Sequence, residues 1–168
     1  MVVDTSLLSS CARAASAAEA RFRIDAPVES RAARVIALDD RAADVIRSVA
    51  DLGWVSARFL VCENVPVGGG VAAGDFLLRD IDGDPTVLAD ELSGAHVVVM
   101  IATQDSGADC AHAIGKACWE RAIMTAGLVL GGGFEVQDAV AALRPHARVL
   151  LPTADESDVV ELLRALRV

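Results

Sequence analysis

The chain contains no tyrosine, and aromatic residues make up only 4% of its 168 residues. Its apolar share of 54% therefore comes mostly from alanine, valine and leucine. Small aliphatic residues are typical of helices packed closely over a parallel sheet, whereas a sandwich of antiparallel sheets is usually richer in aromatics. A chain of this length has room for one domain with a sizeable core. The scarcity of aromatics thus favours a single α/β domain.

Lysine is represented by Lys116 alone, and the formal net charge is −9 at pH 7. Nucleic-acid binding needs clustered lysine and arginine, so the composition excludes a general nucleic-acid-binding protein. No stretch reaches the roughly 18 uninterrupted apolar residues of a membrane-spanning helix. The first residues also lack the basic region of a signal peptide. We therefore expect a cytoplasmic protein without a membrane partner.

The four cysteines lie far apart in the sequence and form no CxxC pair. We expect them to be free thiols that serve as small core residues. On a helix, His112 projects about 120° away from Cys118, so Asp109, Cys110, His112 and Cys118 do not converge on one ion. The sequence therefore predicts no metal site. The cysteines are Cys11, Cys62, Cys110 and Cys118.

Strand-like and helix-like segments alternate along most of the chain. Strands are predicted at 33–38, 57–62, 76–81, 96–102, 124–130 and 148–151, and helices at 5–22, 41–52, 86–92, 107–122, 135–143 and 156–166. Such alternation predicts a three-layer, Rossmann-like α/β fold, with a mainly parallel, doubly wound sheet and helices on both faces. We divide the chain into an N-terminal helix and connector (1–31) and the α/β domain (32–168). The N-terminal helix lies outside the predicted sheet, so we expect a homo-oligomer to form through it.

Several local signals set the expected ends of helices. Asp40 is predicted to be the N-cap of the helix over 41–52, with Gly53 as its stop signal. Pro85 is predicted at the first turn of the helix over 86–92. Trp54 and Trp119 are expected to pack at helix ends, and an exposed Trp119 would instead indicate a subunit contact.

Parallel strands bring their carboxyl ends to one edge of a sheet, where open α/β sheets bind their ligands. Glu63, Thr103 and Asp105 are predicted on this rim, together with a set of candidate ligand-binding residues. An alternative is that Ser106 or Asp105 only caps its helix and that the other groups are solvated. A Mg²⁺ ion at Asp39, Asp40 and Asp105 is also weighed against solvated acids. The candidate binding residues are Asp39, Asp40, Asn64, Gly69, Gln104, Ser106, Gly107, Gly131 and Asp155.

The order and spacing of several segments carry a family resemblance. These segments are ARVIALDDRAADVIRSVADLG, ARFLVCEN, VPVGGGVAAGD, LADELSGAHVVVMIATQDSGADCAHAIGKACWERAIMTAGLVLG and LRPHARVLLPTAD. Together they resemble the nucleotide-binding domain of FtsZ, the bacterial relative of tubulin, over about residues 33–155. The phosphate loop of that family is rich in glycine and threonine, and the corresponding residues here are 104–109. The resemblance implies a guanine nucleotide as ligand.

Asp105 and Asp109 would face the phosphate charge in such a loop, where Gly107 is the glycine that remains. We therefore expect a small-molecule or nucleotide-binding α/β domain of FtsZ-like topology with weak or no GTPase activity. The alternative is an interaction or structural protein that kept the scaffold and lost the nucleotide site. An enzyme that uses a thiol, such as Cys62 or Cys110 beside His96 or His112, is a third interpretation.

Overall fold

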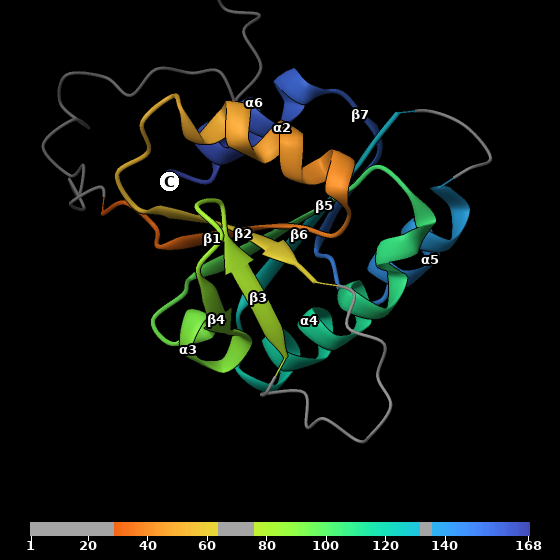
Figure 1. Cartoon of the computed structure of the whole chain (residues 1–168), viewed down its shortest axis with the longest axis horizontal. Helices are drawn as coiled ribbons and strands as arrows, with labels where there is room; N and C mark the ends of the chain where they lie inside the picture. Colours follow the sequence, from red (N-terminus) through yellow and green to blue (C-terminus); the bar gives the residue numbers. More distant parts are fainter. Residues whose placement is uncertain (1–28, 64–75, 132–135) are drawn as a thin grey trace, which may run out of the picture.

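The computed structural model describes residues 29–63, 76–131 and 136–168, and one seven-stranded sheet runs through this part of the chain (Figure 1). The order of its strands is β4-β3-β2-β1-β5-β6-β7. The predicted helix over 5–22, and the homo-oligomer expected through it, lie outside the described residues. The strands are β1 (Ala33–Ala37), β2 (Ala57–Cys62), β3 (Leu77–Asp80), β4 (Pro85–Val87), β5 (Val97–Ala102), β6 (Met124–Leu130) and β7 (Val149–Ala154). The helices are α2 (Asp40–Ala50), α3 (Leu88–Leu92), the 3₁₀ helix η1 (Asp105–Gly107), α4 (Ala108–Glu120), α5 (Gln137–Leu143) and α6 (Glu156–Ala165).

Five strands of the sheet are parallel, which confirms the predicted doubly wound α/β fold. The strand β1 pairs with β2 on one side and with β5 on the other, and β6 and β7 continue the parallel sheet. The strand order therefore reverses between β1 and β5, which makes this the topological switch point. β3 and β4 are antiparallel additions next to β2.

Helices cover both faces of the sheet, as Figure 1 shows: α2 and α6 lie on one face, and α3, α4 and α5 lie on the other. The side chains of residues 35–38, at the end of β1 and just after it, alternate between the two resulting cores. Ile36 and Leu38 pack with the α3, α4 and α5 side, while Val35 and Ala37 pack with α2 and α6. β5 is buried along its whole length, because a central parallel strand is covered on both faces.

The prediction of a helix over 86–92 is wrong at its start. Pro85–Val87 form the edge strand β4, in which Thr86 pairs with Leu78 and Pro85 with Arg79, and the helix α3 begins only at Leu88. Proline lacks an N–H group, and an edge strand tolerates that lack as well as a first helical turn does. The strand predicted over 76–81 is consequently an interior strand, β3, between β2 and β4.

A buried ion-pair cluster fixes α3 over the sheet. The carboxylate of Glu91 lies 3.1 Å from Arg34 Nε and 2.9 Å from Arg58 Nη2, and the Thr86 hydroxyl donates to it at 3.0 Å. Arg34 and Arg58 are register partners on β1 and β2. Glu91 is thus buried with opposite charges beside it, as a buried carboxylate requires.

The structure differs from two predictions about the ends of helices, namely the N-cap of α2 and the packing of Trp119. The N-cap of α2 is Asp39, not Asp40, because its carboxylate accepts the amide of Ala42 at 2.8 Å. The helix ends at Ala50, and Gly53 follows at a φ of +75°, which glycine adopts without strain. Trp54 packs at this end and donates its indole N–H to Val49 O at 2.8 Å, as predicted. Trp119 does not pack, since 80% of it is exposed.

Two of the cysteines expected to be free thiols are joined. A disulfide links Cys62, at the end of β2, to Cys110, in the first turn of α4, with 6.5 Å between the Cα atoms. The residues are 48 positions apart in the sequence, and the sheet order brings them together. Cys118 fits the prediction, because it is a free thiol buried in the core. Within the described residues, no helix combines the length and apolar character needed to cross a membrane.

Candidate functional site

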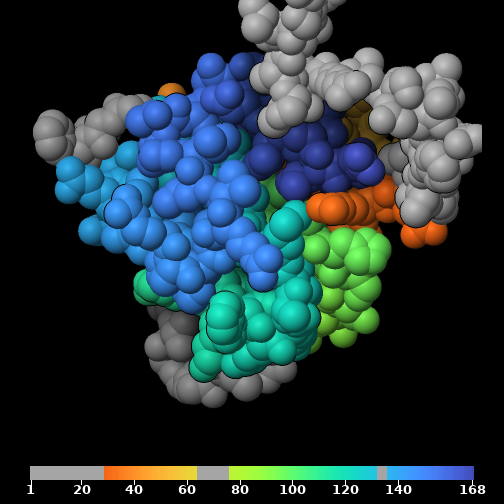
Figure 2. Space-filling view, turned by 180° about the vertical axis from the view of Figure 1, so that it is seen from behind, coloured from red at the N-terminus to blue at the C-terminus, as the bar shows by residue number. Residues whose placement is uncertain are grey.

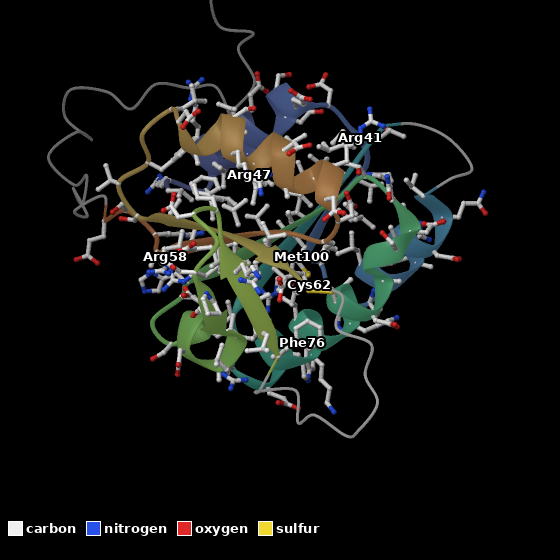
Figure 3. All side chains as sticks on the ribbon, viewed as in Figure 1. Arg41, Arg47, Arg58, Cys62, Phe76 and Met100 are labelled. Atoms are coloured by element: carbon white, nitrogen blue, oxygen red, sulfur yellow. A yellow bond between two sulfur atoms is a disulfide. The ribbon has the colours of Figure 1, made fainter. Side chains whose placement is uncertain are left out.

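A cavity of about 770 Å³ opens where β1, β2 and β5 end, next to the reversal of strand order. We call it the crevice. Its wall contains residues 38–40 after β1, residues 61–63 at the end of β2, residues 79–83 from the end of β3 and the turn that follows it, Arg47 of α2, and Gln104 and Ser106 after β5. Figure 3 shows Arg47 on α2 above the sheet and Cys62 at the end of β2. The cavity therefore lies where an open α/β sheet places its ligands.

The carboxylate of Asp39 joins the two strands that flank the switch point. Its Oδ2 accepts the amides of Thr103 at 2.6 Å and Gln104 at 3.0 Å. Its Oδ1 accepts the Thr103 hydroxyl at 2.6 Å and the amide of Ala42 at 2.8 Å. Asp39 is 5% exposed. The predicted site residue Asp39 thus holds the floor of the crevice together, and its acceptor sites are occupied by protein donors.

Four of the predicted binding residues line the crevice: Asp39, Asp40, Gln104 and Ser106. Gly107 packs against Leu38 of the crevice wall, where a Cβ atom on Gly107 would come within 2.6 Å of Leu38 O. The structure therefore uses Gly107 for the close approach of η1 to β1. The predicted residues Asn64 and Gly69 lie outside the described residues.

Gly131 and Asp155 lie at the ends of β6 and β7 and are not part of the crevice wall. Gly131 adopts a φ of +90° and donates its amide to Ala154 O at 3.2 Å, so it continues the pairing of β6 with β7. The carboxylate of Asp155 caps α6. Hydrogen bonds from the Ser157 hydroxyl and from the amides of Asp158 and Ser157 hold the pKa of Asp155 below its usual value.

Two rim carboxylates predicted to face a ligand are bound to protein groups. Asp105 Oδ1 accepts the amide of Ala139 at 2.8 Å, so this carboxylate links η1 to α5. Glu63 forms an ion pair with Arg79, and this hydrogen bond and charge raise the pKa of the Arg79 guanidinium. Arg79 also donates to Gly83 O at 3.0 Å. The pair ties the end of β2 to the turn between β3 and β4.

Sequence reasoning missed the contribution of the β3–β4 hairpin to the crevice. Arg79 and Asp80 lie on β3, which pairs antiparallel with β2, and Asp82 lies in the turn that follows β3, so this strand and its turn add to the cavity wall beside β2. The usable signal was the Asp82-Gly83 pair, which is typical of a tight connection between two strands. Asp80 fixes this turn, since its Oδ1 accepts the amides of Asp82 and Asp84, each at 3.0 Å.

The crevice has a strongly acidic wall. Its described lining residues include five carboxylates and two guanidinium groups, an excess of three negative charges: Asp39, Asp40, Glu63, Asp80 and Asp82 against Arg47 and Arg79. Arg47 is itself 2.9 Å from Asp44. Such a wall attracts cationic or hydroxyl-bearing groups and repels free phosphate. Cys62 also lines the cavity, which places the disulfide in its wall.

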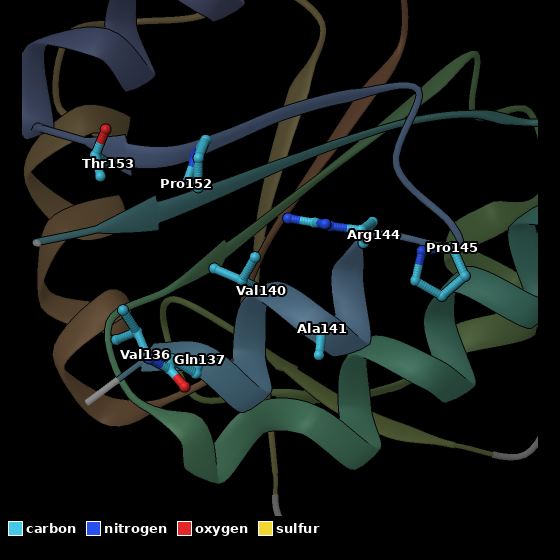
Figure 4. A pocket seen from close by; sticks show the side chains of 8 residues that line it. All are labelled: Val136, Gln137, Val140, Ala141, Arg144, Pro145, Pro152 and Thr153. Atoms are coloured by element: carbon cyan, nitrogen blue, oxygen red, sulfur yellow. The ribbon is translucent and has the colours of Figure 1, made fainter. Parts of the chain in front are cut away.

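A second cavity, of about 600 Å³, lies between α5 and β7 (Figure 4). Val136, Val140 and Pro152 give it an apolar character, and the side chain of Arg144 extends across it in Figure 4. Among the lining residues that the structure describes there is no carboxylate, thiol or imidazole. This groove therefore offers a packing surface but little chemistry.

The fold and the crevice define a doubly wound α/β domain with a polar cavity at its switch point. No protein-family model matches the chain, and no curated protein matches its sequence. Within the described ranges, no group of three or more histidine, cysteine, aspartate or glutamate side chains is arranged to hold a metal ion.

Proposed function

We propose that the chain is a small-molecule-binding α/β domain whose ligand occupies the crevice. The observation that carries this proposal is the position of the 770 Å³ cavity at the carboxyl ends of β1, β2 and β5. A cavity of this size holds a ligand of nucleoside or dinucleotide dimensions. The hydrogen bonds of Asp39 preform its floor, so binding costs little ordering of the backbone.

The chemistry of the wall selects among ligands. Asp40 and Asp82 are exposed acceptors at the cavity, so hydroxyl, amine and amidine groups find partners there. A ribose or another polyol suits this wall. A narrower form of the proposal is that the ligand is a guanine nucleotide, as the FtsZ resemblance implies. Its phosphates would need Mg²⁺ to offset the carboxylates, and weak or no GTPase activity is expected with it.

Thermal unfolding with candidate ligands tests the proposal. Guanosine, adenosine, GTP, GDP, ATP, NAD and FAD are compared, each with and without Mg²⁺. A ligand present at 100 times its Kd adds about 2.7 kcal/mol to the free energy of unfolding and raises Tm. We expect a nucleoside to raise Tm without Mg²⁺ and a nucleotide to do so only with it. If none of these compounds raises Tm, the nucleotide form of the proposal is wrong.

Paired variants then locate the site. Asp40→Asn and Asp82→Asn each remove an exposed carboxylate from the crevice wall, and we expect either to weaken ligand binding at least tenfold. Glu161→Gln, an equally exposed site on α6, is the matched control. Equal affinity in all three variants would show that the ligand binds elsewhere.

We propose as a second function an interaction or structural role, favoured by the exposure of Trp119. This side chain is 80% exposed at the end of α4, and a large exposed aromatic is typical of contact surfaces. Sedimentation velocity of the wild type and of Trp119→Ala tests it. The wild type should self-associate and the variant should not. A monomer at all concentrations removes the support for self-association.

A further inference from the structure

His112 and His146 meet on the face of the molecule where α4 contacts the segment that follows α5. In Figure 2 these parts, teal and blue, lie against each other on the surface. His112 is exposed on α4, and His146 is partly buried in the turn between α5 and β7. His112 Nδ1 lies 3.3 Å from His146 Nε2, and the two rings are nearly perpendicular, with an interplanar angle of 85°.

The ring of His146 is held in a fixed place by its surroundings. A Cβ atom at Gly115 would lie 2.2 Å from His146 Cγ, so the ring occupies the space that this glycine leaves on α4. The amide of His146 donates to Leu143 O at 3.0 Å, and its carbonyl accepts the Thr125 hydroxyl. Gly115 comes three residues after His112, so the helix presents both on one face. The pair is therefore a preformed arrangement of two imidazoles.

The distance between the two nitrogens equals the distance expected between two nitrogen ligands of one metal ion. Two imidazole nitrogens bound to one tetrahedral Zn²⁺ at 2.0–2.1 Å lie about 3.3 Å apart. In the metal-free pair, one ring donates its N–H to the lone pair of the other. On binding, that proton moves to the other nitrogen of the same ring, so that both facing nitrogens give lone pairs to the ion. No proton is released, and the rings keep one N–H each.

We propose that His112 and His146 form a two-imidazole site for a divalent transition-metal ion of the Cu²⁺, Ni²⁺ and Zn²⁺ class. Imidazole nitrogen suits these ions, whereas Mg²⁺ and Ca²⁺ prefer oxygen ligands. Since the described residues offer no third histidine, cysteine or carboxylate to the same ion, its other positions hold water or an external ligand. Cu²⁺ binds more tightly than Ni²⁺ or Zn²⁺, as the order of divalent-ion affinities requires.

This site is independent of the crevice. His146 precedes β7 and contacts Thr125 near the start of β6, so the pair lies toward the amino ends of these strands. The crevice lies at the carboxyl ends of β1, β2 and β5. Loss of ligand binding in the crevice and loss of metal binding at the histidines are therefore separate results.

Metal titration of the untagged full chain tests the proposal. Cu²⁺, Ni²⁺, Zn²⁺ and Mg²⁺ are titrated by calorimetry into the wild type, His112→Gln and His146→Gln. The control is His96→Gln, which changes the remaining histidine of the chain, an exposed residue whose Nδ1 accepts the amide of Ala32 at 3.1 Å. We expect one equivalent of Cu²⁺ in the wild type and the control, at least tenfold weaker binding in the other two variants, and no binding of Mg²⁺.

Electron paramagnetic resonance of the Cu²⁺ complex adds a spectroscopic readout. Hyperfine splitting from two imidazole nitrogens is expected in the wild type and from at most one in His112→Gln. Because His112 is exposed, this variant folds normally even where His146→Gln does not. Equal Cu²⁺ affinity in the wild type and His112→Gln, or loss of binding in His96→Gln alone, would overturn the proposal.

Discussion

The carboxylate of Asp39 accepts both the amide and the hydroxyl of Thr103, each at 2.6 Å. This relationship connects residues 64 positions apart and joins the ends of β1 and β5 across the switch point. The same carboxylate caps α2. One buried side chain therefore positions the two strands and the helix that border the crevice.

Asp39→Ala should be strongly destabilising, because it removes the cap of α2 and leaves the amides of Thr103 and Gln104 without their acceptor. Each buried donor that loses its hydrogen-bond acceptor lowers the free energy of unfolding by about 1–3 kcal/mol, so we expect a total loss of about 3 kcal/mol. Urea denaturation measures it. Asp40→Ala is the matched control and should change stability by less than about 0.5 kcal/mol. Similar losses of stability in both variants would show that the hydrogen bonds of Asp39 do not hold β1, β5 and α2 together.

Thr103→Val measures the contribution of the Thr103 hydroxyl to the contact with Asp39, because the amide of residue 103 stays in place. The substitution keeps the shape and removes the O–H group that donates to Asp39 Oδ1. We expect a loss of about 1 kcal/mol, smaller than that of Asp39→Ala. In the double variant the two losses should not add, since both residues belong to one network. Strict additivity in urea denaturation would contradict the proposed network.

Reduction of the Cys62–Cys110 disulfide should lower stability. The bond closes a loop of 48 residues, and the chain-entropy model gives a stabilisation of about 4 kcal/mol for such a loop. Denaturation curves of the oxidised and reduced protein measure the difference.

Burial raises the pKa of the Cys118 thiol to about 12, so this residue should resist alkylation in the native state. A Cys11→Ser background restricts the alkylation experiment to Cys62, Cys110 and Cys118.

Gly107→Ala should destabilise the protein although alanine favours helices. The added Cβ would lie 2.5 Å from the Cβ atom of Leu38 and 2.6 Å from its backbone oxygen, and the backbone of Leu38 cannot move aside cheaply because its amide is bonded to Ile101 O at 2.9 Å. Overpacking of this kind costs about 1–3 kcal/mol. The Tm of the variant should fall, and ligands of the crevice should bind more weakly. An unchanged Tm would show that η1 can shift away from β1.

Stability should fall as the pH is lowered through the range in which histidine titrates. Burial, and then the charge of His112, lower the pKa of His146 below its usual value of about 6.5. The unfolded chain then binds more protons than the folded chain, so stability is fully present above about pH 6.5 and is lost as the pH falls toward the folded-state pKa. Tm measured with EDTA should drop more between pH 7.5 and 5.5 in the wild type than in His146→Gln. Parallel curves would contradict this assignment.

The sequence predicted the parallel strands and their helices well, because apolar runs such as 97–102 and the periodic pattern over 40–50 are strong local signals. It predicted the wrong state for Pro85–Val87, since a proline before a short apolar segment fits a helix start and an edge strand equally. It placed the cap of the helix at Asp40, one residue too late, because both aspartates suit a cap and only the hydrogen bond from the Ala42 amide identifies Asp39.

Part of the crevice was predictable from the positions of the parallel strands. Asp39, Asp40, Gln104 and Ser106 follow strands whose parallel order brings their ends together. Arg79 and the turn after β3 depend on an antiparallel pairing that no local pattern specifies. The disulfide depends likewise on the placement of α4 beside β2. Disulfides are typical of oxidising compartments, so the redox state of this pair in cells would test the prediction of a cytoplasmic protein.

The central position of β1 has a consequence for how the chain folds. Residues 33–37 can pair with β2 as soon as residue 62 has been synthesised, and Asp39 can cap α2 through a contact only three residues away. The other edge of β1 must wait for β5, more than sixty residues later. Until then the most apolar strand of the sheet is missing, and β1 exposes unpaired N–H and C=O groups. Closing this long loop is the slow, entropically costly step, so mutations at the Asp39–Thr103 contact should act mainly on the rate of folding if that step limits it.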